Sequence, residues 1–128
     1  MIVTRFAAIL LACAGFAAAA EAFPGDTVVL QGIDKVTARV WTFEAPIERV
    51  VRFGSLQIVA HACDRTPPEE PPESTAFLEI HDIHRSDPSQ SLFSGWMFAS
   101  SPGLNGLEHP VYDVWLLECK NAKPQGGR

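Results

Sequence analysis

Apolar and polar residues alternate along most of the chain after residue 22. In residues 56–63 (LQIVAHAC), for example, Leu56, Ile58, Ala60 and Ala62 would all face one side of an extended segment. Seven segments with this period or with a β-rich composition are predicted to be strands: residues 27–33, 35–43, 49–53, 56–63, 77–83, 91–99 and 111–119. Turn residues separate them and no crossover helix can be placed. We therefore expect an all-β fold, a single small antiparallel sandwich or barrel of about seven strands.

Polar segments interrupt this pattern. Residues 64–74 (DRTPPEEPPES) carry four prolines and four acids, which predicts an extended, polyproline-like loop. Its PxxP spacing would also suit an aromatic groove on a partner, although a rigid, solvated connection is the plainer interpretation. Residues 84–90 are predicted to be a polar turn, and residues 100–109 a loop with room for one helical turn at 104–108. The polar, Gly-rich tail 120–128 is expected to be disordered.

The first 22 residues (MIVTRFAAILLACAGFAAAAEA) are predicted to be a signal peptide with a helical apolar centre. Arg5 supplies the positive start, residues 6–16 are apolar, and the alanines that follow suit signal peptidase. The strongly apolar part is shorter than the roughly 20 residues that a membrane-spanning helix needs. One alternative is a lipoprotein box at the sequence LLAC, which would anchor the protein through a lipid on Cys13.

Export changes how the rest of the chain is interpreted. Cleavage after residue 22 would leave 106 of the 128 residues, enough for one β domain at 23–119 in the periplasm or outside the cell. The net charge is −5 and no run of Lys or Arg occurs, so we do not expect nucleic acid as a partner. Two cysteines would remain, Cys63 and Cys119. In an oxidising compartment they are expected to form a disulfide, which would contribute ~4 kcal/mol to stability.

Candidate chemistry is sparse. His61 and Cys63 would share one strand face, but a cysteine in a disulfide cannot bind a metal ion. No metal-binding or nucleophile motif occurs, so we predict no catalytic residue, no cofactor and no metal site. Two alternatives remain open. One is a protein that binds a small ligand or a metal through His61, His81, His84 or His109, and the other is an enzyme that pairs a reduced cysteine with a histidine.

Most aromatic residues are predicted to fill the core, because each buries about 150–250 Å². Trp96 and Phe98 would share one strand face, and Trp115 would share a face with Cys119. Aromatic side chains that are exposed together would instead mark a binding surface. The candidate binding surface comprises six residues in the last quarter of the domain: Trp96, Phe98, Leu104, Asn105, His109 and Tyr112.

Three of these residues, Leu104, Asn105 and His109, lie in the predicted loop before the last strand. His109 precedes Pro110, which favours an extended backbone at a junction between loop and strand. Its imidazole is expected to cap a backbone carbonyl or to face solvent. The sequence pattern leaves open whether this loop lies flat on the core or lines a surface that another molecule contacts.

Four stretches resemble a known family: LQGIDKVTARVWTFEAP, VRFGSLQIVAHAC, PPEEPPESTAFLEI and FSGWMFASSPGLNGLEHPVYDVWLLEC. Together they span residues 30–119 and are similar to a family of short exported proteins of Gram-negative bacteria, classified only as a domain of unknown function. The resemblance implies a periplasmic or cell-envelope setting and carries no activity, cofactor or catalytic residue. We therefore expect an exported, non-catalytic domain that binds or scaffolds an envelope protein or a cell-wall component, and that does not span the membrane once the signal is cleaved.

Overall fold

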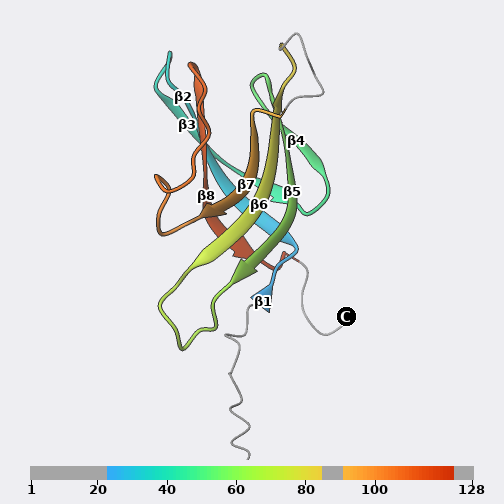
Figure 1. The fold of residues 1–128 in the computed structure, drawn as a ribbon, viewed down its shortest axis with the longest axis vertical. Helices are drawn as coiled ribbons and strands as arrows, with labels where there is room; N and C mark the ends of the chain where they lie inside the picture. The colour runs from blue at the N-terminus through green and yellow to red at the C-terminus, as the bar shows by residue number, and fades with distance from the viewer. Residues whose placement is uncertain (1–22, 85–90, 123–128) are drawn as a thin grey trace, which may run out of the picture.

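The computed structural model of the protein describes residues 23–84 and 91–122, which form two antiparallel sheets that face each other (Figure 1). The strands are β1 (Phe23–Pro24), β2 (Thr27–Asp34), β3 (Arg39–Pro46), β4 (Val50–Phe53), β5 (Leu56–Arg65), β6 (Ser74–Asp82), β7 (Phe93–Phe98) and β8 (Tyr112–Lys120). The predicted all-β antiparallel fold is confirmed for these residues, none of which is helical. The described part accordingly offers no helix long and apolar enough to cross a membrane. The signal helix expected at residues 1–22 lies outside the described residues.

The two sheets differ in size. The first has five strands in the order β1-β5-β6-β7, with β4 paired to the first half of β5. The second has three strands in the order β3-β2-β8. β5 runs the length of the molecule, from its hairpin with β4 to its pairing with β1 near Asp64. The chain crosses from the smaller sheet to the larger one between β3 and β4.

The core lies between the two inner faces. In β6, Leu78 and Ile80 face inward while Glu79 and His81 face outward, as the alternation predicts. The largest fully buried side chains come from both sheets: Val28, Leu30, Leu56, Ile58, Leu78, Ile80 and Leu116. Complete burial of such a side chain contributes about 1.5–3 kcal/mol, so this layer is the main source of stability.

The predicted strand 35–43 is wrong in its first half. Residues 35–38 form the turn between β2 and β3, and the strand begins only at Arg39. The carboxylate of Asp34 accepts hydrogen bonds from the backbone N–H groups of Val36 (2.9 Å) and Thr37 (3.2 Å). These hydrogen bonds stabilise a turn that reverses the chain. The residues of the turn still alternate in polarity, which is why the sequence pattern predicted a strand there.

Two β-bulges reverse the predicted faces of both cysteines. The register between β5 and β6 shifts at His61, so His61 stays on the outer face while Cys63 turns into the core. The register between β2 and β8 shifts at Leu117, which turns Cys119 into the core and away from the face of Trp115. The shared faces predicted for these cysteines are therefore wrong, because a bulge inserts one residue and inverts every later side chain. The two sulfur atoms lie 2.05 Å apart in a disulfide between the sheets.

The loops also differ from expectation. No helical turn forms at 104–108; instead Leu107 is buried, and Asn105 Nδ2 donates a hydrogen bond (2.9 Å) to the carbonyl of Trp96 at the edge of β7. This loop therefore lies against the core and covers a strand edge. The described part of the chain ends at residue 122, so the tail from 123 onward lies outside it.

Candidate functional site

β3 and β4 meet at a corner where the chain passes from one sheet to the other. The N–H of Ile47 donates to the carbonyl of Asp26 (2.9 Å), and the N–H of Glu48 donates to the carbonyl of Ala60 (2.8 Å), so both sheets hold the corner. Glu48 has a positive φ of 64°, which few non-glycine residues adopt. From this corner the two strands diverge, and the sandwich is open at the end where β5 begins (Figure 1).

An aromatic cleft occupies this open end. Its volume is about 410 Å³, within the range of small-molecule sites. It is lined by Asp34, Trp41, Thr42, Phe43, Arg52, Phe53, Gly54 and Tyr112. Phe53 is at its centre: its ring stacks on Phe43 (5.4 Å between centroids) and meets Trp41 (5.6 Å) and Tyr112 (5.4 Å) edge to face. Four aromatic side chains from three strands thus form one surface, with Trp41 the most exposed at 43%.

Two glycines make room for these rings. A Cβ on Gly32 would lie 2.6 Å from the ring of Phe53, and a Cβ on Gly54 would lie 2.4 Å from the ring of Tyr112. Gly54 also has a φ of +58° in the tight turn between β4 and β5, a conformation that favours glycine. The aromatic arrangement therefore depends on the absence of a side chain at both positions.

His109 supports the wall of the cleft behind Tyr112. Its Nδ1 accepts hydrogen bonds from the N–H groups of Val111 (3.0 Å) and Tyr112 (3.1 Å), so the ring proton is on Nε2, which donates to Asp82 Oδ2 (2.9 Å). The expectation of a capped carbonyl or an imidazole facing solvent is wrong: the side chain is 9% exposed, Nδ1 accepts from backbone N–H groups and Nε2 donates to a carboxylate. Both ring nitrogens are occupied, so His109 fixes the start of β8 and is not free to act as a base.

The partner of His109 is Asp82, whose side chain is an ionised carboxylate. Burial raises its pKa, but hydrogen bonds from the backbone of His84 and from the side chains of His109 and Ser55 more than offset burial, and the pKa is lowered overall. An ionised Asp82 fixes the tautomer of His109 and thereby the position of Tyr112.

Two residues of opposite charge line the cleft, Arg52 and Asp34. Arg52 lines it and is exposed, and among residues 23–84 and 91–122 no ion pair or side-chain hydrogen bond engages its guanidinium. The carboxylate of Asp34 is already committed to the N–H groups of its turn. A ligand with a carboxylate beside an apolar group would therefore match both the rings and the arginine.

One wall of the cleft ends in an unpaired strand edge. No described strand pairs with β3 on the side away from β2. In an antiparallel pair, every second residue of a strand bonds to its neighbour. The hydrogen bond from the N–H of Ile47 to the carbonyl of Asp26 shows that the residues of β3 that bond to β2 are those an even number of positions from Ile47. We infer that Val40, Thr42 and Glu44 direct their backbone N–H and C=O groups outward. Such an edge can pair with another polypeptide.

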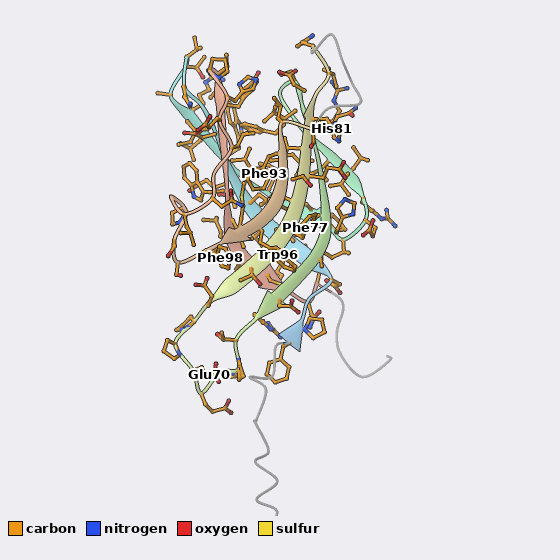
Figure 2. All side chains as sticks on the ribbon, in the orientation of Figure 1. Glu70, Phe77, His81, Phe93, Trp96 and Phe98 are labelled. Atoms are coloured by element: carbon orange, nitrogen blue, oxygen red, sulfur yellow. A yellow bond between two sulfur atoms is a disulfide. The ribbon has the colours of Figure 1, made fainter. Side chains whose placement is uncertain are left out.

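A second aromatic surface lies on the outer face of β5, β6 and β7. Trp96 (40% exposed) and Phe98 share this face as predicted, and Trp96 meets Phe77 edge to face at 5.5 Å (Figure 2). Trp41, by contrast, lines the cleft. Figure 2 shows Trp96 and Phe77 side by side on neighbouring strands, with His81 farther along β6.

Polar side chains on this outer face are joined to one another. His61 Nδ1 lies 3.1 Å from both carboxylate oxygens of Glu48, and its Nε2 lies 2.8 Å from Glu79, which also contacts His81 Nε2 at 3.0 Å. Hydrogen bonds with Glu79 and Glu48 raise the pKa of His61, and those with His61 and His81 lower the pKa of Glu79. In the part of the chain that the structure describes, no group of three or more potential ligands is arranged to hold a metal ion.

The six candidate residues do not form one surface. Trp96 and Phe98 lie on the outer face, and Leu104 (71% exposed) and Asn105 lie in the loop along β7. Only Tyr112 lines the aromatic cleft, with His109 behind it. The other seven residues that line the cleft are not among the six candidates: Asp34, Trp41, Thr42, Phe43, Arg52, Phe53 and Gly54. The sequence carries part of this signal, because Trp41 and Phe43 are two residues apart in an alternating segment and therefore share a strand face. Alternation alone does not distinguish an aromatic side chain in a cleft from one in the core.

Comparisons with known proteins point to a bacterial family. The family described as "Uncharacterized protein conserved in bacteria (DUF2155)" matches residues 28–119, well over half of the chain. This confirms the resemblance to an uncharacterised bacterial family. "Uncharacterized protein RP359" of Rickettsia prowazekii (strain Madrid E) is 28% identical over 67 residues, which cover 52% of this chain and 43% of the relative. The match thus spans less than half of that relative's length. No solved structure matches the chain.

Proposed function

The chain belongs to the DUF2155 family of bacterial proteins, and we propose that it is a non-catalytic binding domain of the cell envelope whose binding site is the aromatic cleft between β3 and β4. The observation that carries this proposal is the cleft itself, in which four aromatic rings and an arginine surround about 410 Å³. Aromatic and arginine side chains dominate the energetics of binding surfaces.

The chemistry of the lining favours binding over catalysis. Phe43, Phe53 and Trp41 offer apolar surface, and Arg52 offers a positive charge with several hydrogen-bond donors. The nearest histidine, His109, has both nitrogens engaged. A site of this composition suits a ligand held by packing and charge.

A segment of polypeptide is the ligand class that fits best. The unpaired edge of β3 offers backbone donors and acceptors next to the rings, and Arg52 offers a partner for a carboxylate. The expected ligand is therefore an extended or turned peptide segment that carries proline or other apolar side chains beside acidic ones. The N-terminal segment 1–22 and the disulfide support an envelope setting, where such a partner would be another exported protein.

Two tryptophans with nearly equal exposure provide a matched test. Trp41 in the cleft is 43% exposed, and Trp96 on the outer face is 40% exposed. Purified wild-type protein, Trp41→Ala and Trp96→Ala would each be used to capture partners from envelope extracts of the source cells. We expect Trp41→Ala to lose at least 90% of the partner that Trp96→Ala retains, because truncating a hot-spot tryptophan at a binding surface costs about 2 kcal/mol or more.

Equal capture by both variants would show that the cleft is not the site. Loss with Trp96→Ala alone would move the site to the outer face. Circular dichroism and thermal unfolding of each variant would establish that a loss of capture does not come from a loss of folding.

A further inference from the structure

The proline-rich loop is a shaped projection at the end of the molecule opposite the cleft. Thr66 closes it: its N–H donates to the carbonyl of Glu73 (3.0 Å), and its hydroxyl donates to the carbonyl of Pro71 (3.0 Å) while accepting from the N–H of Glu73 (3.0 Å). A further bond from the N–H of Glu70 to the carbonyl of Pro67 (3.1 Å) makes the tip a turn. The loop is thus folded back on itself, and the prediction of an extended polyproline-like loop is wrong for its tip.

The tip presents a combination of groups that matches the cleft. Residues 68–72 are all exposed, and Figure 2 shows Glu70 at the outer part of the loop. Within the described residues no ion pair engages the carboxylates of Glu69 and Glu70. Prolines pack well on aromatic faces, and two carboxylates complement a guanidinium that has no described partner.

The loop cannot reach the cleft of its own chain. β5 begins at Leu56, two residues after Gly54 of the cleft, and ends at Arg65, where the loop starts. Its ten residues span about 33 Å at ~3.3 Å per residue, and the strand is held rigidly in the sheet. Any contact between this loop and an aromatic cleft must therefore join two molecules.

We propose that the acidic proline-rich loop of one molecule, residues 66–73, inserts its tip into the aromatic cleft of a second copy. This inference rests on the proposed function of the cleft and names its occupant. Pro68 and Pro71 would pack against Trp41 and Phe53, and Glu69 or Glu70 would pair with Arg52. Each molecule would then offer one loop and one cleft at opposite ends.

Such a contact is heterologous, because the two partners use different surfaces. A heterologous contact adds molecules head to tail and forms either a closed ring or an open chain. The assembly would lengthen with protein concentration, and it would weaken as salt screens the pairing between glutamate and Arg52.

Complementing variants test this arrangement directly. Trp41→Ala removes the cleft but keeps the loop, whereas the double variant Glu69→Lys/Glu70→Lys changes the loop but keeps the cleft. Sedimentation velocity of the cleaved, disulfide-bonded protein should show wild-type mass rising with concentration and each variant alone remaining monomeric. A mixture of the two variants should form a one-to-one heterodimer and nothing larger, because only one productive loop and one intact cleft are present.

Control variants and peptides distinguish this contact from non-specific association. Trp96→Ala should associate as wild type does, since its change lies on the outer face. The peptide DRTPPEEPPES should shift the fluorescence of wild type but not of Trp41→Ala, and the charge-reversed peptide DRTPPKKPPES should bind at least tenfold more weakly. Wild type that stays monomeric at about 1 mM, or a variant mixture that stays monomeric, overturns the inference.

The two proposals fail in different ways. If the purified protein neither self-associates nor binds the loop peptide, but capture from extracts still depends on Trp41, the cleft binds a different protein and only the inference fails. If capture and self-association are both unaffected by Trp41→Ala, the cleft is not a binding site and both fail.

Discussion

The two ends of the sandwich are built from the same alternating strands but have opposite characters. At the closed end the sheets come so near that a Cβ on Gly25 would lie 2.3 Å from Cys119 Sγ, and the disulfide joins them covalently. At the open end the aromatic rings around Phe53 stand between the sheets and leave a cleft. Side-chain size accounts for the difference: small side chains and a disulfide let the sheets approach, and large rings hold them apart. The closed end is thus fixed by a covalent bond, and the open end by the packing of aromatic rings.

The strongest test of this contrast removes the disulfide. We expect the double variant Cys63→Ala/Cys119→Ala to lose ~4 kcal/mol of unfolding free energy, because the bond closes a loop between residues 56 positions apart. Urea unfolding of the variant, with wild type before and after reduction as the comparison, would measure the loss. The aromatic cleft should keep its Trp41 fluorescence in the folded variant. A loss below about 1 kcal/mol would mean that packing alone closes this end.

The fold was largely predictable because buried faces impose a period of two on the strands. Alternation could not reveal the bulges and the turn that interrupt the strands, because these features do not change the residue composition. The bulges at His61 and Leu117 each insert a residue that looks like any other strand residue, yet they decide that both cysteines face the core. The turn at Asp34 likewise depends on a carboxylate that bonds to nearby N–H groups.

The cleft was less predictable than the strands for a related reason. Trp41 and Phe43 could be placed on one face from the sequence alone. Their meeting with Phe53 depends on how the chain crosses between sheets at the corner, and their meeting with Tyr112 depends on the order of strands. The crossing between sheets and the strand order both depend on contacts between distant segments, and a local alternation pattern does not report such contacts. Aromatic residues that line a cleft therefore have the same sequence pattern as aromatic residues in a core.

A pair of glycine variants compares the rigidity of the two ends. Gly25→Ala would place its Cβ 2.3 Å from Cys119 Sγ and 2.8 Å from the carbonyl oxygen of Lys120, atoms that are held by the disulfide and the backbone. The three atoms nearest to a Cβ at Gly32 all belong to the side-chain ring of Phe53, which lines the cleft. Overpacking typically lowers the free energy of unfolding by about 1–3 kcal/mol. We expect a loss of about 3 kcal/mol for Gly25→Ala and of about 1 kcal/mol for Gly32→Ala.

Chemical unfolding would measure both costs, and fluorescence of Trp41 would report displacement of the Phe53 ring in Gly32→Ala. An equal or larger loss in Gly32→Ala would show that the open end is as tightly packed as the closed one. In that case the cleft would be a fixed cavity and not a surface that can adjust to a ligand.

The smallest expected effect concerns the corner from which β3 and β4 diverge. Glu48 lies in this corner with a positive φ, and its carboxylate contacts His61, which contacts Glu79 in turn. This ion-pair chain fastens the corner to the larger sheet, in addition to the bond from the N–H of Glu48 to Ala60. The groups are partly exposed, so we expect His61→Gln to cost at most about 1 kcal/mol.

The cost should depend on pH in a direction set by the two pKa shifts. Contacts with Glu79 and Glu48 raise the pKa of His61 above 6.5, so its contribution is full below that value and is lost as pH rises through the raised pKa. The pKa of Glu79 is lowered below 4.5, so its contribution is full above that value and is lost as pH falls. The stability difference between wild type and His61→Gln should therefore be greatest near about pH 5.5 and should shrink towards about pH 9. His84→Gln, which removes an exposed imidazole, is the matched control and should give a difference that varies less. A difference for His61→Gln that grows with pH would mean that the neutral imidazole, and not the ion pair, holds the corner.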